Sequence, residues 1–338
     1  MQTRLPKKKI AMFLAYCGTD FHGMQINGAL PTIESALFSS LCTVGAVSSA
    51  NADSITKIGF MRSCRTDKGV HAAAQLVSFK CILPSDLGIS EEEFLVRLNE
   101  SLPQSIRVFG FVPVAGGFHA QKACDSRIYE YIFPTWILGA ESSQKLKEVE
   151  ELLKHFEGTH NFHNFTVGKE ATDPSAKRYI KSFALARLFT IPESASGPAC
   201  EWQSLKIHGQ SFMLHQIRKM VGLIFLLVRR KPEIGSEERL EIMDKLFDPS
   251  FKANVPKAPS VGLMLERPFF ETYNSNPVCA HRDRITFDRY NEEIEQFKEQ
   301  FIYPQMWKEE GEQKLFEAWI SCIEEHAYEF EPYLSVSK

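Results

Sequence analysis

The sequence predicts an α+β fold made of two related halves, followed by a helical extension. Short apolar runs with strand character alternate with amphipathic helical stretches along residues 1–272, and the second half repeats the order of the first. Several links are short, which favours antiparallel neighbours within a sheet. The length of 338 residues agrees with this, since it fits about two domains.

The first half, residues 1–114, is predicted to open with a strand, a turn and a helix. Residues 10–15 form an apolar run that ends in the turn-forming sequence Tyr-Cys-Gly-Thr-Asp. A helix follows from Thr32, whose hydroxyl can cap it. Three further strands are expected at 55–65, 72–81 and 107–114. A second helix, capped by Ser90, is expected at 90–100.

The second half, residues 115–272, begins at the Val-Ala-Gly-Gly sequence of residues 114–117. Its strands are expected at 126–133, 178–190 and 200–208, and its helices at 144–156 and 211–230. Ser-Ala-Ser-Gly-Pro at 194–198 is predicted to be a hairpin loop.

The extension, residues 273–338, is charged and helical in pattern. Its apolar stripe predicts packing against the rest of the chain and consists of Trp307, Phe316, Trp319 and Ile320.

Composition is that of an ordinary globular chain, with 44% hydrophobic and 24% charged residues, which excludes collagen-like and wholly disordered classes. The longest apolar run, residues 221–228, is far shorter than the ~20 residues that cross a bilayer, so we expect no membrane partner. Charge is uneven: from Glu271 onward there are 15 acidic and 7 basic residues, which leaves a net charge of +5 on residues 1–270. A basic body suits an anionic partner, although many proteins that bind nothing charged share this balance.

The N-terminal residues carry charge but no following apolar segment, so no secretory signal is predicted. The eight cysteines are scattered without a C-x-x-C pair, and we expect free thiols in a reducing compartment.

The sequence Arg-Thr-Asp-Lys-Gly-Val-His at residues 65–71 lies between two expected strands and has two interpretations. Asp67 and Gly69 suit an ordinary hairpin turn. Alternatively, the loop presents a functional aspartate, with Arg65 on the same side because side chains alternate along extended backbone.

Arg218 stands in the most apolar stretch of the chain, residues 212–228. A buried guanidinium needs a carboxylate partner, whose loss typically costs about 3–5 kcal/mol. The alternative is an arginine whose head group reaches solvent at the helix edge.

Arg127, Tyr129 and Tyr131 alternate along an expected strand and therefore share one face. An arginine among aromatic rings suits a nucleotide, although tyrosines also pack across strands in many sheets. His160 and His163 have metal-ligand spacing but no third ligand nearby, and we expect no metal site. The sequence contains no G-x-G-x-x-G, Walker A or G-x-S-x-G motif.

Six blocks of the sequence resemble the tRNA pseudouridine synthases of the TruA family. They occur in the family's order and lie at 16–27, 65–72, 124–131, 156–166, 215–222 and 258–268. Met24 stands where bacterial relatives usually have tryptophan, which favours the eukaryotic Pus1-like branch.

The resemblance implies two ferredoxin-like halves whose antiparallel or mixed sheets merge around a central cleft, and a reaction without a cofactor. It implies that Asp67 is the catalytic aspartate, that Arg218 pairs with it and keeps it ionised, and that Tyr129 packs against the uracil. Arg65 would help hold the target nucleotide out of its stack. Leu263 would line the uracil pocket, or else be ordinary core. The remaining implied RNA contacts are Thr66, Lys68, His71, Arg127 and Arg178.

The implied activity is isomerisation of uridine to pseudouridine in tRNA, with the target base flipped out of its stack. Two alternatives stay open: an RNA-binding module that has lost catalysis, and a synthase that selects anticodon-stem positions, as the Pus3-like branch does. Messenger and small nuclear RNAs are further candidate substrates. We expect a monomer, in the nucleus, the cytoplasm or both, with organellar location also open.

Overall fold

The computed structural model describes residues 5–139, 142–191, 199–230 and 235–326. These residues form two compact units. The first holds the described residues up to Arg127 together with Met264–Gln305, and the second holds Ile128–Leu263 and the described residues from Met306 onward. The described residues contain nine strands and a helical C-terminal part, as an α+β fold requires.

This division differs from the predicted boundaries at 114 and 272. The strand β9 (Leu263–Phe269) pairs in parallel with β3 (His71–Cys81), with His71 opposite Met264, so most of β9 belongs to the first unit. The extension is also divided, because residues up to 305 belong to the first unit and later ones to the second. Long-range strand pairing of this kind leaves no mark in local sequence.

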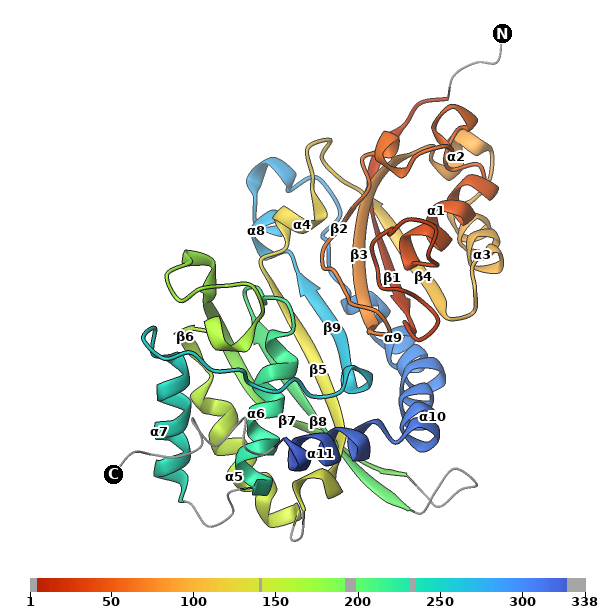
Figure 1. Cartoon of the computed structure of the whole chain (residues 1–338). Helices are drawn as coiled ribbons and strands as arrows, with labels where there is room; N and C mark the ends of the chain where they lie inside the picture. The colour runs from red at the N-terminus through yellow and green to blue at the C-terminus, as the bar shows by residue number, and fades with distance from the viewer. Residues whose placement is uncertain (1–4, 140–141, 192–198, 231–234, 327–338) are drawn as a thin grey trace. The chain divides into compact units, whose positions relative to one another are not determined.

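The first unit has a mixed sheet in the order β4-β1-β3-β9, with β2 paired to β3 (Figure 1). β1 pairs antiparallel with both of its neighbours, and from Ile10 to Tyr16 every residue is buried. The strands not yet bounded are β1 (Lys8–Tyr16), β2 (Met61–Arg62) and β4 (Ile106–Pro113).

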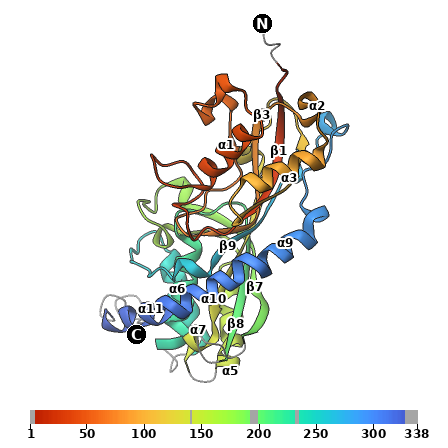
Figure 2. The same cartoon turned by 90° about the vertical axis from the view of Figure 1, so that its right-hand side faces the viewer.

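Two capped helices lie side by side in the first unit, α1 (Ile33–Thr43) and α3 (Glu91–Ser101) (Figures 1 and 2). Both predicted caps are confirmed: Thr32 Oγ1 accepts from the Ser35 amide at 3.2 Å, and Ser90 Oγ accepts from the Glu93 amide at 3.1 Å. The short helices of this unit are α2 (Pro84–Leu87), α4 (Ala120–Ala123) and α8 (Glu271–Asn274).

The predicted strand at 55–65 is largely wrong. Residues 55–58 form a 3₁₀ turn, and only Met61–Arg62 pair as a strand. The backbone of Cys64 bonds instead to the side chain of Gln75: the Cys64 amide donates to Oε1 at 3.3 Å, and Nε2 donates to the Cys64 carbonyl at 3.0 Å. A side-chain amide therefore takes the place of a strand partner, and the ladder ends early.

The second unit has strands in the order β5-β8-β7-β6. β7 and β8 form a long antiparallel pair, with Phe183 opposite Ile207. The bounds are β5 (Ser126–Pro134, its first two residues in the first unit), β6 (Gly158–Asn161), β7 (Lys177–Ile191) and β8 (Cys200–Gly209). The helix α5 (Ser142–His155) contacts β7 and packs against α6 (Gln216–Arg230) and α7 (Ser236–Phe247) (Figure 1).

The helix predicted at 211–230 begins only at Gln216. His215 has a φ of 61°, a left-handed backbone conformation that the helix cannot contain. Gln216 closes the turn before it, since its amide donates to the Met213 carbonyl at 3.1 Å and its Oε1 accepts from the Met213 amide at 2.9 Å. The hairpin loop predicted at 194–198 lies outside the described residues.

The extension is helical and packed, as predicted. α9 (Asn291–Phe297), a π-helical turn (Lys298–Ile302) and α10 (Tyr303–Gln313) follow one another without interruption, and α11 (Leu315–Glu325) comes next (Figure 2). In the second unit, Phe316 is fully buried between Tyr131 and Trp202, and Trp319 Nε1 donates to the Lys257 carbonyl at 2.9 Å. In the described part of the chain, every helix is too short or too polar to cross a membrane.

A buried ion pair fixes the extension to the first unit. Lys298 Nζ lies 3.1 Å from Glu266 Oε2, and the two side chains are only 2% and 9% exposed. Lys298 also contacts Glu295, which is half exposed, at 3.0 Å. A buried pair with one partner removed leaves an uncompensated charge, whereas an exposed pair contributes little.

We expect Lys298→Met to lower the free energy of unfolding by about 3–5 kcal/mol, because Glu266 then keeps its charge in the core without its cation. Glu295→Ala is the matched control, and its loss should stay below about 1 kcal/mol. Urea unfolding followed by circular dichroism measures both. Equal losses in the two variants would contradict the assigned importance of Glu266.

Candidate active site

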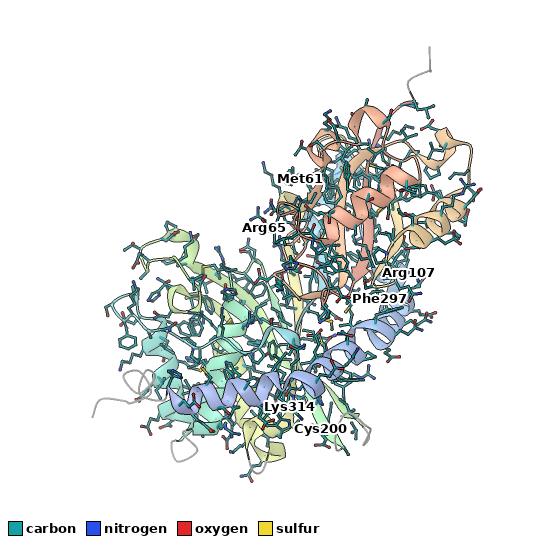
Figure 3. The ribbon with its side chains drawn as sticks, turned by 45° about the vertical axis from the view of Figure 1, so that its right-hand side comes forward. Met61, Arg65, Arg107, Cys200, Phe297 and Lys314 are labelled. Carbon is teal, nitrogen blue, oxygen red and sulfur yellow. The ribbon has the colours of Figure 1, made fainter. Side chains whose placement is uncertain are left out.

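The loop that carries Asp67 joins β2 to β3 in the first unit. The Val70 amide donates to the Asp67 carbonyl at 3.1 Å, and Gly69 has the positive φ of 75° that this turn requires. The side chains of Arg65, Asp67 and Lys68 are exposed. Figure 3 shows Arg65 at the surface of this unit, on the same side as Met61 of β2. The loop thus presents a carboxylate flanked by two cations.

Buried partners hold the start of this loop. Gln75 is fully buried and bonds both backbone groups of Cys64, as described above. Arg127, from the start of β5, donates from Nε to Cys64 Sγ and from Nη2 to the Ser63 carbonyl, both at 3.2 Å. We therefore assign Arg127 to holding the loop. Its predicted role as an RNA contact stays a prediction.

The first sequence block, residues 16–27, supports the middle of the loop. Tyr16 and Thr66 share a hydrogen bond of 2.8 Å between their hydroxyls, and the Met24 amide donates to the Thr66 carbonyl at 3.2 Å. At Gly23, with φ 89°, a β-carbon would lie 2.8 Å from that same carbonyl oxygen. At Gly18 a β-carbon would lie 2.2 Å from the Val70 carbonyl oxygen. Only glycine permits this close approach of the two segments.

Thr66 and His71, which are also predicted to contact RNA, have buried side chains, and their RNA contacts stay predictions. Thr66 is 7% exposed and bonds Tyr16, and His71 is fully buried. His71 Nδ1 accepts from the Gly18 amide at 3.1 Å. Alternation along the loop explains the outcome, because Arg65 and Asp67 point outward only if Thr66 points inward. Both side chains position the loop.

Cys64 sits beneath the loop in an unusual electrostatic environment. Burial raises the pKa of its thiol, but a hydrogen bond with Cys124 and the charge of Arg127 outweigh that effect and lower the pKa to about 6. Arg127 and Cys124 are therefore the polar partners of this buried sulfur in the support of the Asp67 loop.

In the second unit, Tyr129 is 9% exposed and meets Phe212 edge to face, with 5.3 Å between ring centroids. A tyrosine held in this way offers a fixed ring beside the strand. Leu263 is 8% exposed at the start of β9, which agrees with core and with a pocket wall alike.

Arg218 is half-buried in the first turn of α6. Its Nε donates to the Ala258 carbonyl at 2.7 Å, and the Ala258 amide donates back to the Arg218 carbonyl at 2.9 Å. The side chain is thus held by the block at 258–268. Its pairing with Asp67 stays a prediction.

Arg178 lies on β7 opposite His160 of β6, and its Nη1 donates to the Lys177 carbonyl at 3.2 Å. Partial burial lowers the pKa of its guanidinium. Its role as an RNA contact stays a prediction.

The two histidines with metal-ligand spacing face protein oxygens. His160 Nε2 lies 2.8 Å from the Glu157 carbonyl, and His163 Nε2 lies 2.9 Å from the Phe251 carbonyl. Within the described residues there is no group of three or more histidines, cysteines or acids that could hold a metal ion.

The chain as a whole is similar to known proteins. A family model described as tRNA pseudouridine synthase matches residues 152–271. The "tRNA pseudouridine synthase 1" of Yarrowia lipolytica is 34% identical over an alignment of 415 positions, which covers 96% of this chain and 75% of that protein. The "Pseudouridylate synthase 1 homolog" of Mus musculus is 36% identical, over 96% of this chain and 76% of that protein. The chain belongs to the tRNA pseudouridine synthase family. A relative from Saccharomyces cerevisiae with the same name as the Yarrowia protein is 34% identical, over 87% of this chain and 67% of its own.

The residues that support the loop are less visible in the sequence than the loop itself. Gln75 and Tyr16 show only as polar residues at buried positions of largely apolar strands. That pattern is the available signal, because a polar group at a buried strand position must find a partner.

The neutral form of His71 should make stability depend on pH. Burial lowers the pKa of His71 to about 4, below the usual value of about 6.5. Between these two pH values the unfolded chain therefore binds a proton at this histidine and the folded chain does not. This contribution is complete above about pH 6.5 and is lost as the pH falls toward 4. We expect the free energy of unfolding to be about 2 kcal/mol smaller at about pH 5 than at about pH 7.5 from this group.

His71→Asn, which keeps an acceptor for the Gly18 amide, should remove that part of the pH dependence in urea titrations. His281→Asn, at an exposed histidine, is the control and should leave the pH dependence as it is in the unaltered chain. An unchanged pH profile in His71→Asn would show that another group is responsible.

Proposed function

We propose that this chain isomerises uridine to pseudouridine in tRNA and that Asp67 is the carboxylate that acts on the target nucleotide. The observation that carries the proposal is the loop itself. Asp67 is exposed, while Gln75, Arg127 and Tyr16 anchor the residues before it and Gly18 bonds His71 after it. An exposed side chain on a fixed backbone is what a pre-organised catalytic group requires.

The chemistry starts with a base that is out of its stack, because no side chain reaches C1′ or the uracil ring inside a helix. Arg65 and Lys68 flank Asp67 and suit the phosphates on either side of the flipped nucleotide. The N1–C1′ bond breaks, the uracil turns over, and C5 bonds to C1′. C5 gives up its proton and N1 takes one up, so the base keeps its composition.

Asp67 can take part in two ways. Its carboxylate can add to C1′ and form a covalent intermediate, as carboxylates do in glycosidic chemistry. Alternatively, it can remove the 2′ proton to give a glycal. Both routes need an ionised carboxylate, and Arg218 is the cation that the family resemblance assigns to it.

Tyr129 is proposed to pack against the uracil. Its edge-to-face contact with Phe212 supports this role, because the ring is fixed before any base arrives. We also propose a monomeric state and a nuclear or cytoplasmic location. Messenger and small nuclear RNAs are further proposed substrates.

Asp67→Ala should abolish turnover. We expect release of tritium from C5-labelled uridine in tRNA to fall by at least about 100-fold, the smallest contribution usual for such a group. Because Asp67 is exposed, circular dichroism and urea unfolding should match the unaltered protein. Lys154→Ala, an exposed lysine of α5, is the activity control. Turnover at the original rate in Asp67→Ala would rule out the assigned role, and an unaltered chain that binds tRNA without turnover would instead favour a silent RNA-binding module.

The Asp67–Arg218 pair predicts strong non-additivity. If the two groups act as a unit, Asp67→Asn combined with Arg218→Met should reduce the single-turnover rate about as much as either change alone. Two independent groups would instead multiply their losses. Single-turnover kinetics on one tRNA transcript decide between these outcomes, and multiplied losses would contradict the pair.

A further inference from the structure

We propose that the second unit binds a phosphate group of the substrate RNA in a cavity beside Lys219. This inference deepens the proposed function and rests on it for the source of the phosphate. The cavity has a volume of 350 Å³. The residues that line it belong to two loops and one helix and are His163, Asn164, Thr166–Glu170, Lys219 and Lys252–Asn254.

Lys219 is a buried cation without a counter-ion among the described residues. Lys219 is 5% exposed, and its ammonium group donates only to backbone carbonyls, to Thr166 at 3.2 Å and to Asn164 at 3.4 Å. Among the described residues, no carboxylate lies within ion-pair distance of it. A buried charge is normally paired. An anion in the cavity that Lys219 lines would supply the missing partner.

The charged side chains that line the cavity are mostly cations. Lys169 and Lys252 also line the cavity, where the one acid is Glu170, and Lys169 is paired with Asp173 at 2.7 Å outside the lining. Lys252 and Glu170 form an exposed pair at 3.2 Å that is free to rearrange. Burial and then the nearby charge of Lys257 lower the pKa of Lys219. The site is therefore cationic, and an anionic ligand would favour the charged form of Lys219.

Hydrogen bonds fix the walls of the cavity. Asn164 Nδ2 donates to the carbonyls of Leu246 and Phe251 at 2.8 and 3.0 Å, and its Oδ1 accepts from the Ala253 amide at 2.8 Å. Thr166 Oγ1 donates to the Leu214 carbonyl at 2.9 Å. The sequence block at 156–166, to which the proposed chemistry assigns no group, thus forms one wall.

The size and chemistry of the site fit a phosphate with part of its sugar. Ligand pockets usually measure ~300–1,000 Å³, so this cavity is at the small end. Lysine donates in three directions, of which two go to carbonyls here, and the third remains for a phosphate oxygen. Lys219 follows Arg218 directly in the chain, so this contact would bind RNA next to a residue of the proposed reaction.

Binding of an unmodified tRNA transcript, followed by fluorescence anisotropy over a range of KCl concentrations, tests the proposal. Lys219→Met should weaken binding about 10- to 100-fold, as loss of a hydrogen bond to a charged group does. The slope of log K against log[KCl] should also become shallower by about 0.7–0.9, the value for one phosphate contact. Lys219→Arg keeps the charge and should keep the slope.

Two further variants separate the site from a general effect. Lys154→Ala, an exposed lysine of the same unit that does not line the cavity, should change neither affinity nor slope. Lys169→Glu combined with Lys252→Glu reverses two lining charges and should weaken binding even if Lys219→Met fails to fold. Unchanged affinity and slope in both the folded Lys219→Met and this double variant would overturn the proposal.

Inorganic phosphate distinguishes the source of the anion. If the site takes RNA phosphate, millimolar phosphate should weaken tRNA binding by the unaltered chain more than chloride of equal ionic strength does, and this excess should vanish in Lys219→Met. Phosphate that raises the Tm of the unaltered chain, with no change of the RNA slope in Lys219→Met, would overturn the assignment to RNA. The proposed function fails separately, because a chain without isomerase activity can still show the slope change.

Discussion

The contact between residues 16–24 and Thr66 is the constraint on which the first unit's site depends. Asp67 is exposed and would move with its loop if nothing held its neighbour. Fixing the backbone of a loop residue costs about 1–2 kcal/mol of conformational free energy, and buried hydrogen bonds must offset that cost. The Tyr16 hydroxyl and the Met24 amide bind Thr66 from one side, and the absent side chain of Gly23 lets them come close.

The same design recurs in the second unit, where the sequence blocks also support one another. Arg218 and Ala258 exchange two hydrogen bonds, one through the guanidinium and one through the backbone amide of Ala258. Asn164 binds the segment after α7 through both ends of its amide, at the Phe251 carbonyl and the Ala253 amide. In both units, therefore, these sequence blocks are segments that pack against one another.

Two buried lysines differ in whether the protein supplies a counter-ion for their charge. Lys298 has a buried carboxylate, Glu266, and its environment is complete within the protein. Lys219 is equally buried but meets only carbonyl oxygens and lines a cavity. A burial pattern alone does not distinguish them. The partner does, because a compensated charge stabilises the fold whereas an uncompensated one gains free energy from a ligand.

The sequence by itself determined the local elements and the family. Hydroxyl caps at Thr32 and Ser90, the long strands and the charged helical extension follow from interactions within a few residues, and local patterns record these. Tertiary structure alone decided that β9 returns to the first unit and that Gln75 ends β2. It also decided that Thr66, His71 and Arg127 hold the Asp67 loop. These outcomes depend on partners up to about two hundred residues away in the chain, and no local periodicity encodes such distant contacts.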